Sequence, residues 1–306
     1  MKSFHEEERI CALTFESIGE CYHLWTPENF EIIFTCDSDF QIGMNIIAIC
    51  AKLYPDIRIV TFEWMANHLH MVLAGQESRI RSLLNTLKRF LARYFQANGR
   101  SIDWSHFTPG LRRISSLEDM RNVIIYDNMN GYEISPGHTP FSYPWGANRY
   151  FFNPDACRLA MSQSRKMSLR ERQSSTRSRS ADYVSDILMF DGYALPLSFC
   201  DIETGQRLFR NPSHYFSKVS RSVETDKTIA KEIGENIYYT DSDLFAAVSK
   251  ACRERYGFPS PGQIPSEAKM EIAKMMRFEY NASVKQIQRM LKLGPDTIQA
   301  LGFNPK

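Results

Sequence analysis

The feature that most constrains the fold is a pair of apolar segments joined by a very short connection. Residues 57–65, IRIVTFEWM, and residues 68–75, HLHMVLAG, are rich in β-branched, aromatic and other apolar residues. Segments of this length and composition favour β-strands. Only Ala66 and Asn67 separate them, so the second segment must turn back along the first. The sequence therefore predicts an antiparallel pair of strands.

Helical patterns surround this pair of strands. Apolar residues recur at helical spacing before it in residues 39–53 and after it in residues 78–97, where Asn98 and Gly99 form the stop signal. A further helix is expected from a Ser116 cap to Gly131. With an early strand at 31–36, EIIFTC, the order is a split β-α-β. We therefore expect an α+β fold with a ferredoxin-like antiparallel sheet and packed helices.

A change of composition divides the 306 residues. Residues 162–182, SQSRKMSLRERQSSTRSRSAD, are rich in Ser and Arg and contain few apolar residues, which is typical of a basic linker. The prediction is a catalytic domain at 1–161 and a mainly helical domain at 183–306. Two short helical patterns at 283–302, divided by Gly294 and Pro295, fit a DNA-binding helix-turn-helix or plain helical packing.

Composition excludes several classes of protein. No apolar run is long enough to cross a membrane, and the acidic start is unlike a signal peptide, so we expect a cytoplasmic protein with no membrane partner. Seven cysteines without a C-x-x-C pair favour reduced thiols. The net charge is only +2, so any affinity for nucleic acid must come from local groups of residues.

The two histidines of HLHMVL share one face of the predicted strand, because side chains alternate along a strand. His68 and His70 would then point away from the core together. Imidazoles at this spacing can bind one divalent ion, and a pair of exposed strand histidines is the plainer interpretation.

The predicted helix at 116–131 supplies a second polar group. Tyr126 and Asn130 lie four residues apart, so a phenol and a carboxamide share one stripe. Asp127 and Asn128 are weaker rivals to Asn130, because one and two residues after Tyr126 they are expected to point away from that stripe.

Together, WMANHLHMVL, the basic helix, YDNMNGY and PFSYPWGANRYF resemble the REP-associated tyrosine transposases, relatives of the single-tyrosine HUH transposases of insertion sequences. The resemblance covers about residues 20–152 and implies an HUH catalytic domain. It implies that His68, His70 and Asn130 hold Mg²⁺ or Mn²⁺ and that Tyr126 attacks a DNA phosphate. Ala66 and Gly131 stand where the family usually has prolines.

The resemblance implies a metal-dependent, single-strand DNA endonuclease and strand transferase that acts near DNA hairpins through a 5′-phosphotyrosine. A domesticated hairpin nickase and a non-catalytic DNA-binding regulator are the alternatives, and a homodimer is left open. No phosphate-binding loop that could power strand opening is present, so the partner is expected to be single-stranded or hairpin DNA. The residues expected to contact the DNA backbone are Lys88, Arg89, Arg93, Arg112 and Arg113.

Overall fold

The chain divides into two compact units, which are described separately. The first consists of Met1–Gly131 with His138–Ile229, and the second of Tyr132–Gly137 with Ala230–Lys306. The computed structural model describes residues 4–27, 30–134, 141–220, 241–258, 260–278, 282, 284–294 and 297.

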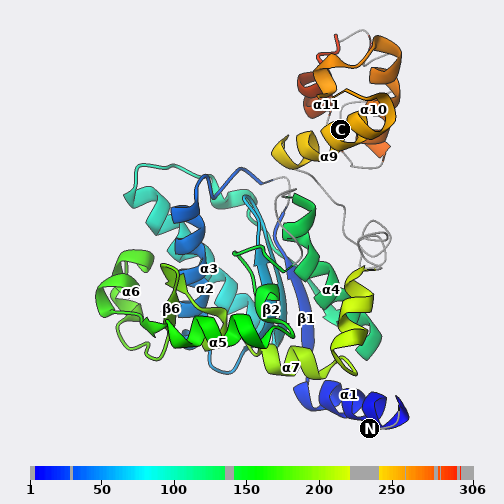
Figure 1. Ribbon diagram of the computed structural model, residues 1–306. Helices are drawn as coiled ribbons and strands as arrows, with labels where there is room; N and C mark the ends of the chain where they lie inside the picture. The colour runs from blue at the N-terminus through cyan, green and yellow to red at the C-terminus, as the bar shows by residue number, and fades with distance from the viewer. Residues whose placement is uncertain are drawn as a thin grey trace. The chain divides into compact units, whose positions relative to one another are not determined.

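The first unit contains an antiparallel four-stranded sheet flanked by helices (Figure 1). The strand order in space is β2-β3-β1-β4. The mixed helix and sheet content confirms the α+β expectation. In chain order its first elements are α1 (Phe4–Ile18), β1 (Cys21–Trp25), α2 (Asp37–Leu53), β2 (Arg58–Trp64), β3 (Leu69–Ala74), α3 (Glu77–Ala97), η1 (Trp104–His106), β4 (Gly110–Ile114) and α4 (Leu117–Ile134).

The first strand of the sheet is not where the sequence predicted it. It is formed by Cys21–Trp25, whereas residues 31–35 are irregular. Residues 31–35 are apolar because they form a buried loop rather than a strand. Ile33 and Phe34 are buried, and their N–H groups both donate to the Ala66 carbonyl. An apolar run therefore marked a core loop rather than a strand.

The central strands are buried on both faces because helices cover both sides of the sheet. Figure 1 shows α4 on one side and α2 with α3 on the other. On the α2 side Phe62 and Trp64 are fully buried, and Gly43 of α2 lies close to the Trp64 indole. The opposite face carries polar residues, and it forms the site described below.

The segment predicted to be a linker is instead folded within the first unit. Ser168 and Glu171 form a reciprocal capping box that starts α6 (Leu169–Thr176), and Arg165 pairs with Glu171 at 2.5 Å. Buried Ser175 and Thr176 end this helix, which packs against α2 and α3. Polar residues fold here because local hydrogen bonds satisfy them. The predicted linker at 162–182 and the boundary at 161 were therefore wrong.

The first unit continues well past residue 182. A small sheet is formed by β5 (Arg165–Lys166), β6 (Leu188–Phe190) and β7 (Tyr193–Ala194), in that order. It packs beside α2, where the Asn45 carboxamide oxygen accepts from the Ala194 N–H at 2.8 Å. Residues 212–220 are helical. The later elements are η2 (Asn148–Tyr150), α5 (Pro154–Ser162), β5 (Arg165–Lys166), α6 (Leu169–Thr176), η3 (Arg179–Ala181), β6 (Leu188–Phe190), β7 (Tyr193–Ala194), η4 (Pro196–Ser198) and α7 (Ile202–Arg207).

These later segments also cover the outer edge of the sheet. Strand β2 has β3 on one side only, and its other side forms bridges from Ile59 to Cys200 and from Glu63 to Gly146. The Trp64 N–H donates to the Trp145 carbonyl at 2.8 Å. The outer edge of β2 is therefore covered by hydrogen bonds to segments that lie about 80 to 140 residues later in the sequence.

In the second unit the described residues are largely helical. They form α9 (Asp241–Tyr256), η5 (Pro261–Gln263), α10 (Ser266–Phe278) and α11 (Val284–Leu291) around a core that includes Leu244, Ile272 and Ile287. The helical character expected for this part of the chain is found in these residues. Of the predicted helix-turn-helix at 283–302, only α11 and a few residues after it are described, and the rest lies outside the described residues.

Candidate functional site

A layer of buried polar side chains lies between α4 and the sheet. The register of β1 and β3 pairs Trp25 with His70 and His23 with Val72. Residues paired across strands share a face, and so do residues two apart along one strand. His23 and His70 therefore lie on the same face, and their rings stack with centroids 5.8 Å apart.

Helix α4 adds a carboxylate to these two imidazoles. Asp127 Oδ1 lies 3.0 Å from His23 Nε2 and 3.7 Å from His70 Nδ1. One ligand atom from each of the three residues lies within 4.8 Å of the other two, which is a spacing that fits a single metal ion. All three side chains are fully buried. This His23–His70–Asp127 group is the candidate metal site.

Burial sets the protonation states in this layer. It raises the pKa of Asp127 well above the ordinary value, and the charge of Arg112 opposes this only in part. Burial lowers the pKa of His70 well below its usual range, and the neighbouring His68 and His23 lower it further. Neutral imidazole is the form of histidine that binds metals. A bound cation would also favour the ionised form of Asp127, so the residues present fit a cation.

Tyr126, the predicted nucleophile, lies against this group. Its ring meets the His70 ring edge to face at a centroid distance of 5.4 Å and the His23 ring at 6.1 Å. The ring is buried, with 3% of the residue exposed. The structure therefore brings together Tyr126 and His70, as the sequence predicted, and adds His23 and Asp127.

The two other predicted metal ligands lie beside this group but are not part of it. The His68 ring is 5.2 Å from that of His70, and its Nδ1 is 2.7 Å from Asn67 Oδ1. The Asn130 carboxamide donates to the Tyr126 carbonyl at 3.3 Å, a contact along the helix. Their role as ligands stays a prediction of the family resemblance.

The expectation that His68 and His70 point away from the core was wrong. They are 4% and 0% exposed, and burial lowers the pKa of His68 to about 3. The strand alternation was sound, but α4 covers the second face of the sheet, so both faces of β3 are interior.

A glycine lets α4 lie close to the neighbouring loop. A Cβ on Gly131 would lie 2.2 Å from the Tyr143 ring and 2.7 Å from Glu63 Oε1, which is closer than a methyl group can approach. The Tyr143 hydroxyl donates to the Trp64 carbonyl at 2.7 Å, so this ring is fixed in the packing. Burial raises the pKa of Glu63 well above normal, although the Gly131 N–H opposes this. This packing explains why glycine, rather than a proline, suits position 131.

Next to the metal group, neutral side chains form a closed hydrogen-bond network. The Thr61 hydroxyl donates to Asn128 Oδ1 at 2.5 Å, and Asn128 Nδ2 donates to the Tyr215 hydroxyl at 2.9 Å. The Tyr215 hydroxyl donates to Asn148 Oδ1 at 2.6 Å, and Asn148 Nδ2 donates to the backbone carbonyl of Asn128 at 2.7 Å. This network fixes α4 on the sheet at the residue that follows Asp127.

The predicted DNA-binding residues fall on two surfaces. Lys88, Arg89 and Arg93 belong to α3, on the opposite side of the sheet from α4 (Figure 1), and Lys88 donates to the Phe107 carbonyl at 3.3 Å. Arg112 makes a double hydrogen bond to Asp119, at 2.8 and 2.9 Å, and Arg113 lies 3.3 Å from Glu20. These arginines of β4 therefore have acidic partners in the protein, and DNA contact by the five residues remains a prediction.

Sequence reasoning missed His23 and Asp127 for separate reasons. His23 lies in CYHLW, an aromatic strand that was overlooked because the strand was placed at 31–36. Asp127 was set aside as pointing away from Tyr126, but both side chains reach the sheet. Neighbours on a helix are about 100° apart, so a helix face pressed against a sheet can include two consecutive residues.

Comparisons with protein-family models, curated proteins and solved structures found no match to this chain. Among the described residues, no helix combines the length and the apolar character needed to cross a bilayer. The chemistry of the site therefore has to be argued from the residues themselves.

Proposed function

We propose that this protein is a metal-dependent enzyme that cleaves and rejoins single-stranded DNA near hairpins, with Tyr126 as the nucleophile. The observation that carries the proposal is the contact of the Tyr126 ring with His70 and His23, the two imidazoles that Asp127 joins. To form a covalent phosphotyrosine, an enzyme needs a phenol as nucleophile and a group such as a metal ion that stabilises charge on the phosphate. A tyrosine beside a metal-binding group can supply both.

The topology of the first unit supports the same proposal. The order β1-α2-β2-β3-α3-β4 with strand order β2-β3-β1-β4 is compatible with the ferredoxin-like sheet that we propose. His70 lies on β3 and Tyr126 on α4, and these positions are compatible with the HUH domain that the resemblance implies.

The donor atoms favour one of the two expected metals. The group offers two imidazole nitrogens and one carboxylate oxygen, from His23, His70 and Asp127. Mg²⁺ prefers oxygen ligands and retained water, whereas Mn²⁺ accepts imidazole more readily. We therefore propose Mn²⁺ over Mg²⁺. A bound divalent ion would supply Lewis-acid stabilisation of charge on a phosphate oxygen.

The remaining chemistry belongs to the chain. The Tyr126 oxygen would form a bond to phosphorus while the bond from phosphorus to the 3′ oxygen breaks. The phenol loses a proton, and the departing 3′ oxygen gains one. One phosphate ester replaces another, so the bond energy is retained, and the reverse reaction rejoins the strand without ATP.

One observation favours a second candidate function. His23, His70 and Asp127 are fully buried and Tyr126 is 3% exposed, so a phosphate would reach this layer only after the residues that cover it move. A protein that binds DNA without cutting it would not need this movement. The alternative is therefore a non-catalytic DNA-binding regulator that has the same fold.

A cleavage assay separates the two candidates. The full-length protein is incubated with a labelled single-stranded hairpin oligonucleotide, with Mn²⁺ or with excess chelator, and covalent adducts are resolved on a denaturing gel. We expect adducts only with Mn²⁺, far fewer with a perfect duplex of the same sequence, and none with Tyr126→Phe. Tyr183→Phe is the matched control, because Tyr183 is 94% exposed and lies outside the layer.

The possible results have distinct meanings. Equal adduct formation by Tyr126→Phe and wild type would move the nucleophile elsewhere. Hairpin binding with no adduct under any metal condition would support the non-catalytic candidate. Cleavage that survives in excess chelator would remove the metal from the proposal.

A further inference from the structure

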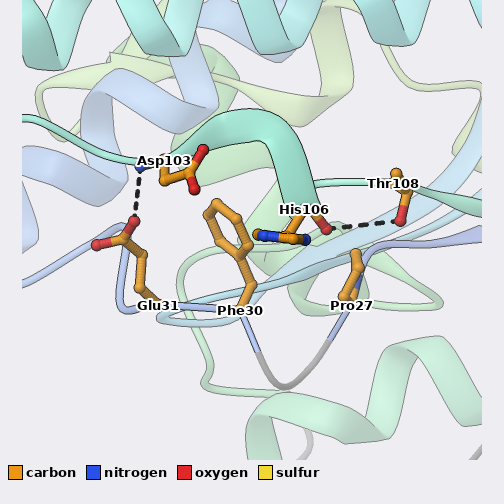
Figure 2. Close-up of a pocket in the computed structure, with 6 residues that line it drawn as sticks. All are labelled: Pro27, Phe30, Glu31, Asp103, His106 and Thr108. Carbon is orange, nitrogen blue, oxygen red and sulfur yellow. Dashed lines mark hydrogen bonds between the residues drawn. The ribbon is translucent and has the colours of Figure 1, made fainter.

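A pocket of about 450 Å³ opens on the first unit (Figure 2). Figure 2 shows the Phe30 ring between the carboxylates of Glu31 and Asp103 on one side and the imidazole of His106 on the other. Pro27 and Thr108 complete the lining. The Phe30 ring packs against Trp104 and Phe107 and is 8% exposed, so it offers the pocket a small apolar surface beside the acidic groups. The pocket volume lies in the range of small-molecule sites.

Hydrogen bonds within the protein join the two loops that form this pocket. Glu31 Oε1 accepts from the Asp103 N–H at 2.9 Å, and Asp103 Oδ1 accepts from the Ser105 N–H at 3.0 Å. Hydrogen bonding by Ser105 lowers the pKa of Asp103, so this carboxylate is charged at neutral pH. In each of these contacts one carboxylate oxygen is engaged, which leaves the second as an acceptor toward a ligand.

The pocket lies at the end of the sheet where the histidine strand begins. The Phe30 carbonyl accepts from the Asn67 carboxamide at 3.2 Å, and Asn67 immediately precedes His68. Pro27 follows Thr26, which pairs with Leu69 through its N–H and its hydroxyl, at 3.0 and 2.8 Å. The pocket therefore lies beside the start of β3, next to the segment that carries the two histidines.

The lining chemistry selects the kind of ligand. Two carboxylates repel a phosphate, so the pocket does not suit a DNA backbone. A metal ion is also a poor fit, because the metal-type grouping found among the described residues is His23–His70–Asp127 rather than these residues. What suits an aromatic ring beside carboxylate acceptors is a planar group that donates hydrogen bonds. An unpaired nucleic-acid base with an exocyclic amino group has this chemistry.

We infer that this pocket binds an unpaired base that carries an exocyclic amino group and rejects a base with a carbonyl oxygen in that place. The inference rests on the proposed function for its ligand class, single-stranded DNA. Glu31 and Asp103 accept hydrogen bonds from the amino group, and the Phe30 ring provides an apolar surface for the base. The pocket is then a specificity element next to the histidine strand.

Cytosine and uracil provide a matched pair for the test, because uracil has a carbonyl oxygen where cytosine has an amino group. Two labelled oligonucleotides share one hairpin and differ only in an unpaired flank of deoxycytidines or deoxyuridines. Binding to the full-length protein is measured by fluorescence anisotropy in chelator, so that cleavage does not intervene. We expect the cytosine flank to bind about tenfold more tightly, as one hydrogen-bonded base contact predicts.

Asp103→Asn is the informative variant, because the amide can still accept from Ser105 while it offers a donor to the ligand. The cytosine preference should fall toward one in Asp103→Asn and Glu31→Gln and stay unchanged in Glu203→Gln, an exposed acidic control on α7. Equal wild-type affinities for the two flanks would overturn the inference and leave the proposed function standing. Failure of both oligonucleotides to bind would overturn the proposed function as well. The ratio of the wild-type affinities for the cytosine and uracil flanks tests the inference even if a variant does not fold.

Discussion

Two halves of one buried polar layer meet at consecutive residues of α4. Asn128 belongs to a neutral network in which Thr61, Tyr215 and Asn148 satisfy one another by hydrogen bonds. Asp127 belongs to the His23–His70–Asp127 group, in which burial shifts the pKa values of Asp127 and His70 away from normal. The neutral network stabilises the fold through hydrogen bonds among its own members. The second half would gain from a cation, so it is where a ligand is expected.

The largest expected effect is the loss of cleavage rate when a histidine that binds the metal is removed. His23→Ala removes a member of the His-His-Asp group and should lower Mn²⁺-dependent cleavage by about 100-fold or more. His68→Ala removes a neighbour and should cost about tenfold, the range for groups that orient a ligand. Initial rates on the hairpin substrate measure both, with circular dichroism as the check on folding. A larger loss for His68→Ala would return the ligand role to the residue that the family resemblance implies.

Metal binding should stabilise the wild-type fold. An ion that binds only the folded state at about 100 times its Kd adds about 2.7 kcal/mol, which raises the melting temperature by several degrees. Asp127→Asn keeps the shape of the side chain but removes the anion, so its melting temperature should not respond to Mn²⁺. Thermal melts with and without Mn²⁺ provide the measurement, and an equal rise in wild type and Asp127→Asn would contradict the metal site.

The neutral network should show the opposite behaviour. Tyr215→Phe leaves Asn128 and Asn148 without their shared buried partner, which should lower the free energy of unfolding by about 1–3 kcal/mol. The rise in melting temperature with Mn²⁺ should remain. Urea unfolding compared with Tyr183→Phe isolates the effect, and loss of the Mn²⁺ response in Tyr215→Phe would show that the two halves are coupled.

The smallest effect is expected at an exposed ion pair outside the layer. Hydrogen bonding to Arg165 lowers the pKa of Glu171 from 4.5 to about 2. A lowered pKa in the folded state stabilises the fold above the unfolded value, and the gain is lost as pH falls from about 4.5 to about 2. Because the pair is partly exposed, the contribution is less than about 1 kcal/mol.

Glu171→Gln tests this contribution. It should be slightly less stable than wild type in urea unfolding near neutral pH, and the difference should shrink as the pH falls below about 4. A difference that stays constant across that interval would assign the effect to the capping box rather than to the charge.

Sequence periodicity located most of the elements around the site. The predicted strands at 57–65 and 68–75 and the helix starting after Ser116 are found as β2, β3 and α4, and the Ser116 hydroxyl accepts from the Asp119 N–H at 3.1 Å. These elements are predictable because each has a long apolar pattern of its own. Tyr126 and His70 lie within these elements, so the sequence placed them on a helix and a strand, and their roles remain predictions of the family resemblance.

What the sequence could not show depended on contacts between distant residues. The strand that carries His23 is short, and Ile33 and Phe34 looked more like a strand although they are buried as a loop. The position of Asp127 beside the two histidines depends on how α4 is rotated against the sheet, which Gly131 and the Asn128 network fix. The fold of residues 162–182 depends on capping and ion pairing rather than on apolar periodicity.

The bridges that cover the outer edge of β2 have a consequence for the growing or truncated chain. An uncovered edge strand exposes unpaired backbone groups that can pair with another molecule. Here the covering partners are Gly146 and Cys200, so the sheet stays open until a long following segment has been synthesised. A fragment that ends at residue 161 would lack the Cys200 bridge and keep part of this edge exposed. We expect such a fragment to aggregate, whereas one that extends through residue 220 should remain monodisperse in light scattering.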